Sequence, residues 1–332
     1  MNETHHEDPS SQRILQSEPH TEGIDRSRKR KPPKNLVDGM IKALRPKQWV
    51  KNVLVLAAPA AAGVDALFDW RTLADVFLAF VVFCLGASSI YLVNDARDVD
   101  ADREHPTKRF RPIASGVLPL NLAYAMAVGL IAAAIGLSFL ATDGLQLALV
   151  IAVYIALQLG YCFGWKHMPV IDIALVSSGF MLRTMAGGVA AGIVLSQWFL
   201  LVAAFGSLFM AAGKRYSEIL LAESTGAKIR KSLESYTPTY LRFVWTLSAA
   251  AVVIFYSLWG FEFASETDGP AAVWYQISMV PFTIAILRYA ADVDRGHGGA
   301  PDEIALSDRV LQTLALLWMF CIAMAVYVVP LF

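Results

Sequence analysis

Residues 72–102 read TLADVFLAFVVFCLGASSIYLVNDARDVDAD, a long apolar run that ends in a cluster of acidic side chains. A membrane-spanning helix needs roughly 20 consecutive apolar residues, and this run supplies them up to Val93. The whole chain agrees, because 56% of its 332 residues are hydrophobic, 17% are charged and its mean hydropathy is +0.49. Soluble domains hold about 25% charged residues. The sequence therefore predicts an all-α, polytopic membrane protein.

Nine apolar runs of this kind follow one another along the chain. We expect nine transmembrane helices, near residues 50–65, 72–93, 119–140, 144–163, 169–190, 196–213, 240–261, 271–290 and 309–330. Cytoplasmic loops are enriched in Lys and Arg. If the amino terminus is cytoplasmic, 26 of the 28 basic residues fall on the inner side, and the exceptions are Arg71 and Arg183. This pattern predicts a multi-pass helical bundle in the plasma membrane, with its chemistry facing the cytoplasm.

The amino-terminal segment differs in composition from the rest of the chain. Residues 1–36 are rich in Ser, Glu, His and Pro and lack apolar periodicity, which is typical of a disordered tail. We expect residues 37–332 to form one transmembrane domain. The chain holds 28 basic and 28 acidic residues, so its charge balance argues against a nucleic-acid partner. The cysteines, Cys84, Cys162 and Cys321, lie in apolar runs and are interpreted as small hydrophobic residues.

The acidic cluster has the pattern N-D-x-x-D-x-x-x-D, from Asn94 to Asp102. On a continuing helix, Asp95, Asp98 and Asp102 share one face with Asn94. Carboxylates this close repel one another unless a cation lies among them, and hard oxygen ligands favour Mg²⁺. We therefore predict that the three aspartates are catalytic and that all four residues are metal ligands, with Asn94 also near the substrate. The alternative is a solvated acidic helix end.

A basic loop follows the acidic cluster directly. Lys108, Arg109 and Arg111 lie between two prolines, and cationic side chains of this kind bind phosphate oxygens. Carboxylates that hold a metal, next to cations that hold phosphate, predict a diphosphate site. For Arg109 an ordinary positive-inside loop residue is an equal alternative.

These motifs resemble the UbiA superfamily of intramembrane prenyltransferases, from about residue 40 to the end of the chain. More narrowly, three stretches look like those of members that move phosphoribose onto decaprenyl phosphate in actinobacterial cell-wall synthesis. They are R-P-K-Q-W-x-K-N at 45–52, N-D-x-x-D-x-x-x-D-R-x-H-P-x-K-R-x-R-P-I-A-x-G at 94–116, and G-K-R-Y-S-E at 213–218. The resemblance implies a phosphoribosyl pyrophosphate donor, a polyprenyl phosphate acceptor and Mg²⁺, and it suggests a trimer.

The second half of the expected site departs from the prenyl-transferring members. They carry D-x-x-x-D in the loop after the sixth span, where this chain has Lys214 and Arg215, with Glu218 as the nearest carboxylate. Such a wall suits a phosphate directly, and phosphoribosyl pyrophosphate carries a 5-phosphate besides its diphosphate. The alternatives are a prenyltransferase with a polyprenyl diphosphate donor and, from another class, a transporter. Residues 225–238 form either an amphipathic helix over the cavity mouth or a solvated loop.

Several other polar residues are candidates for substrate binding. A cation within a span costs roughly 2.5–3.5 kcal/mol, so we expect Arg183 to anchor a substrate phosphate. An ion pair with Asp172 is a poor alternative, because about 16 Å of helix separates the two. Lys166, alone in a short inner loop, is a second phosphate candidate. Four residues that open the first helix either contact the donor or extend to the membrane interface, namely Lys47, Gln48, Lys51 and Asn52.

Overall fold

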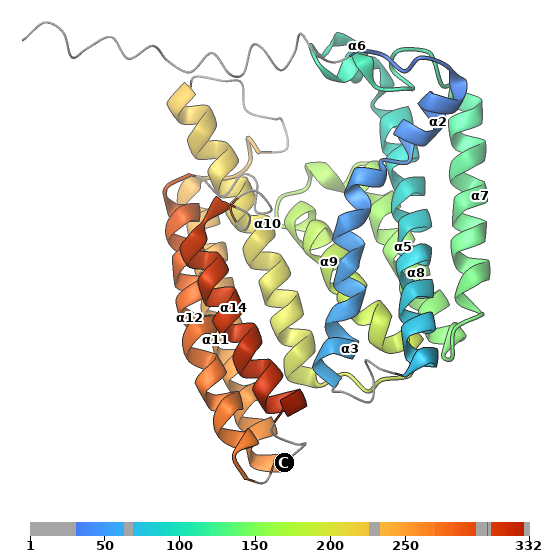
Figure 1. The fold of residues 1–332 in the computed structure, drawn as a ribbon. Helices are drawn as coiled ribbons and strands as arrows, with labels where there is room; N and C mark the ends of the chain where they lie inside the picture. Colours follow the sequence, from blue (N-terminus) through green and yellow to red (C-terminus); the bar gives the residue numbers. More distant parts are fainter. Residues whose placement is uncertain are drawn as a thin grey trace, which may run out of the picture.

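The computed structural model describes residues 31–62, 69–225, 233–267, 269–296, 304 and 307–328. These parts form helices joined by short loops (Figure 1). The elements are α2 (Leu36–Ala43), η2 (Pro46–Leu56), α3 (Ala57–Ala62), α5 (Trp70–Arg97), α6 (Val99–Glu104), η3 (Lys108–Phe110), α7 (Leu120–Ser138), α8 (Gly144–Cys162), η4 (Trp165–His167), α9 (Ile171–Ala190), α10 (Gln197–Thr225), α11 (Pro238–Glu266), α12 (Ala271–Asp294), α14 (Arg309–Ala323) and η5 (Met324–Val328). The all-α prediction is confirmed. Most of the predicted tail, residues 1–30, lies outside the described residues.

Eight helices in the described ranges are long and apolar enough to cross a membrane. They correspond to the second through ninth predicted spans. The first predicted span, 50–65, instead contains η2, a 3₁₀ helix, followed by the six residues of α3, and its last residues lie outside the described part of the chain. The count of nine stays a prediction.

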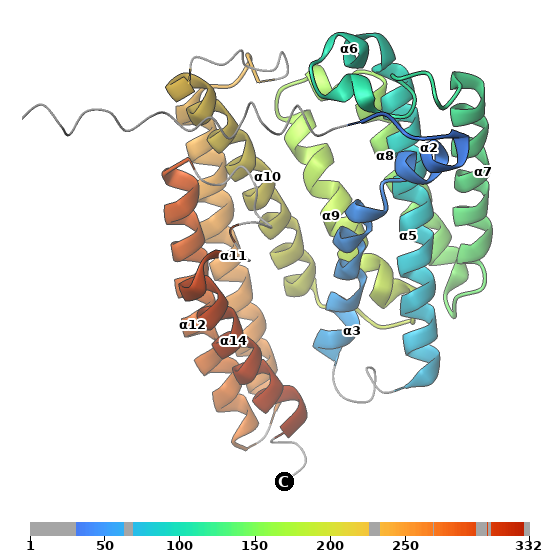
Figure 2. The same ribbon diagram turned by 45° about the horizontal axis from the view of Figure 1, so that its top comes forward.

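Two groups of helices flank α10. In Figures 1 and 2, α5, α7, α8 and α9 lie on one side of α10, and α11, α12 and α14 lie on the other. One buried apolar cluster joins η2, α5, α7, α8 and α9, and a second joins α9, α10, α11 and α12. The α9 helix contributes to both clusters, so it connects the two groups.

The 3₁₀ helix η2 packs unusually close to α9, and a glycine makes this possible. A Cβ atom added at Gly187 would lie 1.7 Å from the carbonyl oxygen of Val55. No side chain fits there without moving the backbone of η2. Glycine at this position therefore sets the distance between η2 and α9.

The basic loops gather at one end of the bundle. Figure 1 shows α2, α6 and the last turns of α10 at this end, whereas α3 lies at the other. Ion pairs between separate elements confirm the grouping, because Arg45 reaches α5 and Lys166 of η4 reaches the end of the same helix. The end that carries α2 and α6 is therefore the one that holds the predicted site.

Candidate functional site

The three aspartates of the acidic cluster do not share one face. The helix α5 ends at Arg97, and Asp98 has a backbone outside the helical region (φ −91°, ψ 11°) before α6 begins at Val99. Our prediction of one continuous helical face was wrong because this break turns Asp98 away from its neighbours. Asp95 and Asp102 are turned toward Arg111, whereas Asp98 contacts Lys166 on the other side.

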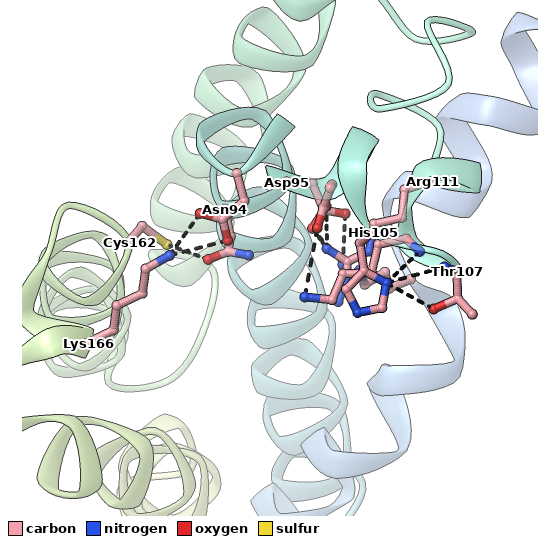
Figure 3. A network of polar contacts seen from close by, with 11 residues as sticks. Asn94, Asp95, His105, Thr107, Arg111, Cys162 and Lys166 are labelled. Atoms are coloured by element: carbon pink, nitrogen blue, oxygen red, sulfur yellow. Dashed lines mark hydrogen bonds and ion pairs between the residues drawn. The ribbon is translucent and has the colours of Figure 1, made fainter. Parts of the chain in front are cut away.

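Two arginines hold Asp95. The guanidinium Nη2 of Arg45 donates to both carboxylate oxygens of Asp95, at 2.6 and 2.8 Å. Nη1 of Arg111 donates to Asp95 Oδ1 at 3.2 Å and to Asp102 Oδ2 at 2.5 Å, and Lys108 lies 3.8 Å from Asp102 (Figure 3). The Asp95 and Asp102 side chains are 4% and 3% exposed. Each buried carboxylate is therefore neutralised by at least one cation.

The other side of the cluster faces the end of α8. Lys166 Nζ donates to the carboxylate of Asp98 at 2.9 and 3.2 Å. Beside this pair, the Cys162 thiol donates to Asn94 Oδ1 at 3.8 Å (Figure 3). The predicted substrate residue Lys166 and the predicted ligand Asn94 thus lie next to the acidic cluster.

A divalent cation would have to displace these internal cations. The described residues contain no group of three or more His, Cys, Asp or Glu side chains placed to share a metal ion. Nevertheless, Asp95 and Asp102 converge on one positively charged atom, Nη1 of Arg111, with oxygen ligands of the hard type that Mg²⁺ binds. Asp95 and Asp102 therefore have the donor chemistry to hold a divalent cation, whose remaining ligands would be water and substrate phosphate.

A second charged cluster lies at the start of α9 and on α10. The helix α10 continues to Thr225, so Lys214, Arg215 and Glu218 lie on a helix and not in the loop that we predicted, because the apolar run Ile219–Leu221 extends it. Nε of Arg215 lies 3.5 Å from Asp172, and its Nη1 lies 3.3 Å from Glu218. Arg215 is therefore already neutralised, whereas Lys214 is exposed.

Asp172 is also held from the segment that leads into α11. The Tyr236 hydroxyl donates to Asp172 Oδ1 and accepts from the backbone N–H of Val170. Burial, together with the hydrogen bond to Asp172, raises the pKa of Tyr236 above its usual value, so this hydroxyl stays protonated and remains a donor. Of the predicted segment 225–238, residues 226–232 lie outside the described residues.

The carboxyl end of α8 lies between the two clusters. Tyr161 interacts with the guanidinium of Arg215, and the next residue, Cys162, contacts Asn94 of the acidic cluster. Two neighbouring residues of one helix thus touch a member of each cluster. The clusters therefore lie in one region, at the end of the bundle that carries α2 and α6 (Figure 1).

Arg183 is buried among polar groups of η2, α8 and its own helix α9. Its guanidinium donates to Asn52 Oδ1 at 2.7 Å, to the carbonyl oxygen of Gly179 at 2.5 Å and to the Tyr154 hydroxyl at 2.9 Å. The ion pair with Asp172 that we considered a poor alternative does not form, because Asp172 pairs with Arg215. Asn52 is fully buried here, so of the two roles considered for it, extension to the interface is excluded.

The remaining predicted residues lie nearer the surface. Lys47, Lys51 and Arg109 are exposed, and Gln48 is partly buried. The Arg109 guanidinium lies over the ring of Phe110 at 4.9 Å, which is compatible with an ordinary loop residue. Reasoning from the sequence missed Arg45, Tyr154, Asp172 and Tyr236 as members of the charged network. Only Arg45 had a signal, since it opens the R-P-K-Q-W motif beside the residues that we selected.

The chain matches the model of the UbiA prenyltransferase family over residues 52–306. Among curated proteins, it is 78% identical to a decaprenyl-phosphate phosphoribosyltransferase of Corynebacterium glutamicum, over 99% of this chain and 98% of the relative. It is 63% identical to the protein of the same name from Mycolicibacterium smegmatis, over 89% of this chain and 95% of the relative. The chain therefore belongs to the UbiA prenyltransferase family.

Solved structures give the same fold. A UbiA homologue from Archaeoglobus fulgidus, bound to GPP and Mg²⁺, aligns with a TM-score of 0.62 at 15% identity and covers 88% of this chain and 99% of that chain. A structure described for digeranylgeranylglyceryl phosphate synthase aligns with a TM-score of 0.63 at 14% identity, over 88% of this chain and 98% of that chain. At this identity the likeness concerns the fold alone, and it confirms the UbiA-like bundle.

Proposed function

We propose that this protein is a membrane phosphoribosyltransferase. It moves 5-phosphoribose from phosphoribosyl pyrophosphate to a polyprenyl phosphate and releases pyrophosphate. The acceptor is decaprenyl phosphate, as the name of the C. glutamicum relative indicates. The observation that carries the proposal is the placement of cations in both clusters, with Lys214 and Arg215 where a prenyl-diphosphate site would require further carboxylates. The names of the relatives that are 78% and 63% identical support the same donor and acceptor.

The charge around the acidic cluster suits a diphosphate that arrives with a divalent cation. Three carboxylates face four cations, Arg45, Lys108, Arg111 and Lys166. If one divalent cation takes over the carboxylates, the basic side chains that paired with them become available to an anion with several negative charges. The cluster therefore accommodates metal and diphosphate together better than either alone.

Each group has a defined task in the proposed site. Mg²⁺ would be held by Asp95, Asp98, Asp102 and Asn94. Asp98 would become available when Lys166 leaves it for a phosphate of the donor. Bound Mg²⁺ would act as a Lewis acid on the departing pyrophosphate. Lys108, Arg111 and Lys166 bind the diphosphate oxygens, while Lys214 binds the 5-phosphate from the other side. Arg215, held by Asp172 and Glu218, orients that wall.

The transfer needs little proton chemistry. The lipid phosphate is ionised at neutral pH, so one of its oxygens attacks the anomeric carbon as the bond from that carbon to pyrophosphate breaks. The residues contribute positioning and stabilisation of the leaving group. Arg183, within the bundle, supplies a further cation beside Tyr154 and Asn52 for a phosphate at the inner interface. We place this site on the cytoplasmic side of the plasma membrane, in a homo-oligomer.

A comparison of labelled donors tests the proposal. Full-length protein in lipid nanodiscs receives Mg²⁺, decaprenyl phosphate and either labelled phosphoribosyl pyrophosphate or a labelled polyprenyl diphosphate with an aromatic acceptor. We expect a labelled transfer product, resolved from the labelled donor by chromatography, from the first donor only, and none when EDTA replaces Mg²⁺. Label from the polyprenyl diphosphate alone would contradict the proposal and favour the prenyltransferase alternative. Turnover of either donor would exclude a purely transporting role.

A further inference from the structure

Arg45 has a backbone conformation that arginine rarely adopts. Its φ of 52° and ψ of 57° lie in the left-handed region, and the structure describes only one other residue besides glycine with positive φ. The next residue is Pro46, and residues before proline favour extended backbone. Such conformations cost energy and persist where the surroundings enforce them, often at functional sites. The contacts of the Arg45 side chain therefore indicate which interaction holds its backbone in this conformation.

Those contacts place the guanidinium of Arg45 at Asp95. Nη2 donates to both oxygens of this carboxylate at 2.6 and 2.8 Å, and the guanidinium lies over the ring of Tyr91 at 4.7 Å from its centre. Asp95 is 4% exposed, and a buried carboxylate without a partner of opposite charge strongly destabilises a fold. Arg45 supplies that charge, together with Arg111.

A guanidinium and a divalent cation on the same carboxylate repel each other, because both are positively charged. Nη2 of Arg45 contacts both oxygens of Asp95, which are the oxygens that a divalent cation would use. The Arg45 side chain is 27% exposed, so part of it is accessible to solvent and to a ligand. An arginine fork also suits two oxygens of a phosphate.

We propose, on the basis of the proposed function, that Arg45 is an exchanging counter-ion. In the donor-free protein it neutralises Asp95 and opposes metal binding. When metal and donor arrive together, Asp95 passes from the guanidinium to the divalent cation, and the guanidinium of Arg45 passes from Asp95 to the donor diphosphate. Metal alone then binds weakly, and metal and donor strengthen each other's binding.

The first test measures metal binding without any donor. Full-length wild-type protein, Arg45→Met and the control Arg103→Met are titrated with Mn²⁺ in nanodiscs, and free Mn²⁺ is followed by electron paramagnetic resonance. Arg103 pairs with the exposed Asp100 and is a matched surface arginine. We expect Arg45→Met to bind Mn²⁺ about tenfold more tightly than wild type, and Arg103→Met to match wild type. Unchanged or weaker Mn²⁺ binding by Arg45→Met would overturn the proposal.

The second test measures donor binding at saturating Mg²⁺. Arg45→Met loses the fork that contacts the diphosphate, so its dissociation constant for phosphoribosyl pyrophosphate should rise about tenfold. A merely structural role of Arg45 would not move the metal and donor affinities in opposite directions. A shift of both affinities in the same direction would contradict the exchange.

A conservative variant covers the case in which Arg45→Met does not fold. Arg45→Lys keeps the charge but lacks the planar guanidinium that contacts Asp95 and lies over Tyr91, so Mn²⁺ binding should tighten by a smaller factor. Mn²⁺ binding by Arg45→Lys no tighter than wild type would overturn the proposal. Because the Mn²⁺ titration contains no donor, it is independent of the labelled-donor comparison, and the failure of one is distinguishable from the failure of the other.

Discussion

The two charged clusters at the end of the bundle that carries α2 and α6 are built in opposite ways. The α5–α6 cluster consists of Asp95, Asp98 and Asp102 with Arg45, Lys108, Arg111 and Lys166. The α10 cluster consists of Lys214, Arg215 and Glu218 with Asp172 and Tyr236. In the first, carboxylates at a helix end are neutralised by cations from loops and from the short 3₁₀ helices η3 and η4. In the second, a buried arginine on a long helix is neutralised by carboxylates on α9 and on α10 itself.

The difference indicates which ion pairs can exchange. Arg45, Arg111 and Lys166 are 27%, 27% and 19% exposed, and they come from segments outside the long helices. Arg215 is 10% exposed and lies within α10, where Asp172 and Glu218 hold it. We infer that the α5–α6 cluster rearranges when ligands bind, whereas the α10 cluster is already assembled. Mutations should therefore affect catalysis in the first, whereas mutations of the buried pair Arg215 and Asp172 in the second should affect stability.

The largest effect should follow from neutralising a carboxylate of the α5–α6 cluster. We expect Asp102→Asn to lower turnover by about 10³-fold, because the proposed site loses an anionic ligand in a position where electrostatics stabilise the leaving group. Phosphoribosyl transfer to decaprenyl phosphate measures this effect. The control is Asp100→Asn two residues away, whose side chain is 89% exposed. Equal activity of the two variants would remove Asp102 from the site.

Breaking the α10 cluster should instead lower stability. We expect Asp172→Asn to reduce the free energy of unfolding by about 3 kcal/mol, because a buried ion pair that loses one partner leaves an uncompensated charge. Tyr236→Phe, which removes one hydrogen bond to the same carboxylate, should cost about 1 kcal/mol. Unfolding in increasing denaturant checks both values. If Asp172→Asn unfolds like wild type but loses donor affinity, the α10 cluster is not preassembled.

A smaller effect should follow from separating η2 from α9. A Cβ at Gly187 would lie 1.7 Å from the Val55 carbonyl oxygen, so Gly187→Ala should cost about 2 kcal/mol of stability through overpacking. It should also lower turnover, since η2 begins directly after Arg45 and carries Asn52, which binds Arg183. The control is Gly129→Ala on α7, where an added Cβ meets nothing within 4 Å. Equal unfolding midpoints for the two variants would contradict the close packing.

The smallest effect concerns the exposed cation of the α10 cluster. We expect Lys214→Ala to raise the KM for phosphoribosyl pyrophosphate about tenfold, the loss of roughly one charge-assisted hydrogen bond, with kcat nearly unchanged. Steady-state kinetics at saturating decaprenyl phosphate separate the two constants. A change confined to the KM for decaprenyl phosphate would assign Lys214 to the acceptor.

The comparison also indicates what a sequence reveals about such a site. Apolar runs give the helical spans directly, because the bilayer fixes their length, and the eight spans from α5 to α14 follow the predicted order. The acidic motif and the basic loop identified one cluster, and Lys166 contacts Asp98 within it, whereas its predicted contact with a substrate phosphate stays a prediction. All of these signals are local in the chain.

The missed features depend on contacts between distant segments or on backbone geometry. The break at Asp98 separates residues that helical periodicity places together. Arg45 and Asp95 are fifty positions apart in the chain, and Arg215 of α10 pairs with Asp172 of the neighbouring helix α9. The two cations on α10 suggested a phosphate site, but Asp172 on α9 and Glu218 on α10 itself neutralise Arg215. Spacing along the chain does not reveal such partners.

The most direct test of the central claim is a cryo-electron microscopy structure of the full-length protein in nanodiscs with Mg²⁺ and a non-hydrolysable analogue of phosphoribosyl pyrophosphate. We expect density for the diphosphate and a cation at Asp95 and Asp102, and density for the 5-phosphate beside Lys214, bridged by one ribose. Density for the analogue at only one of the two clusters, with the other cluster unchanged, would contradict a shared donor site.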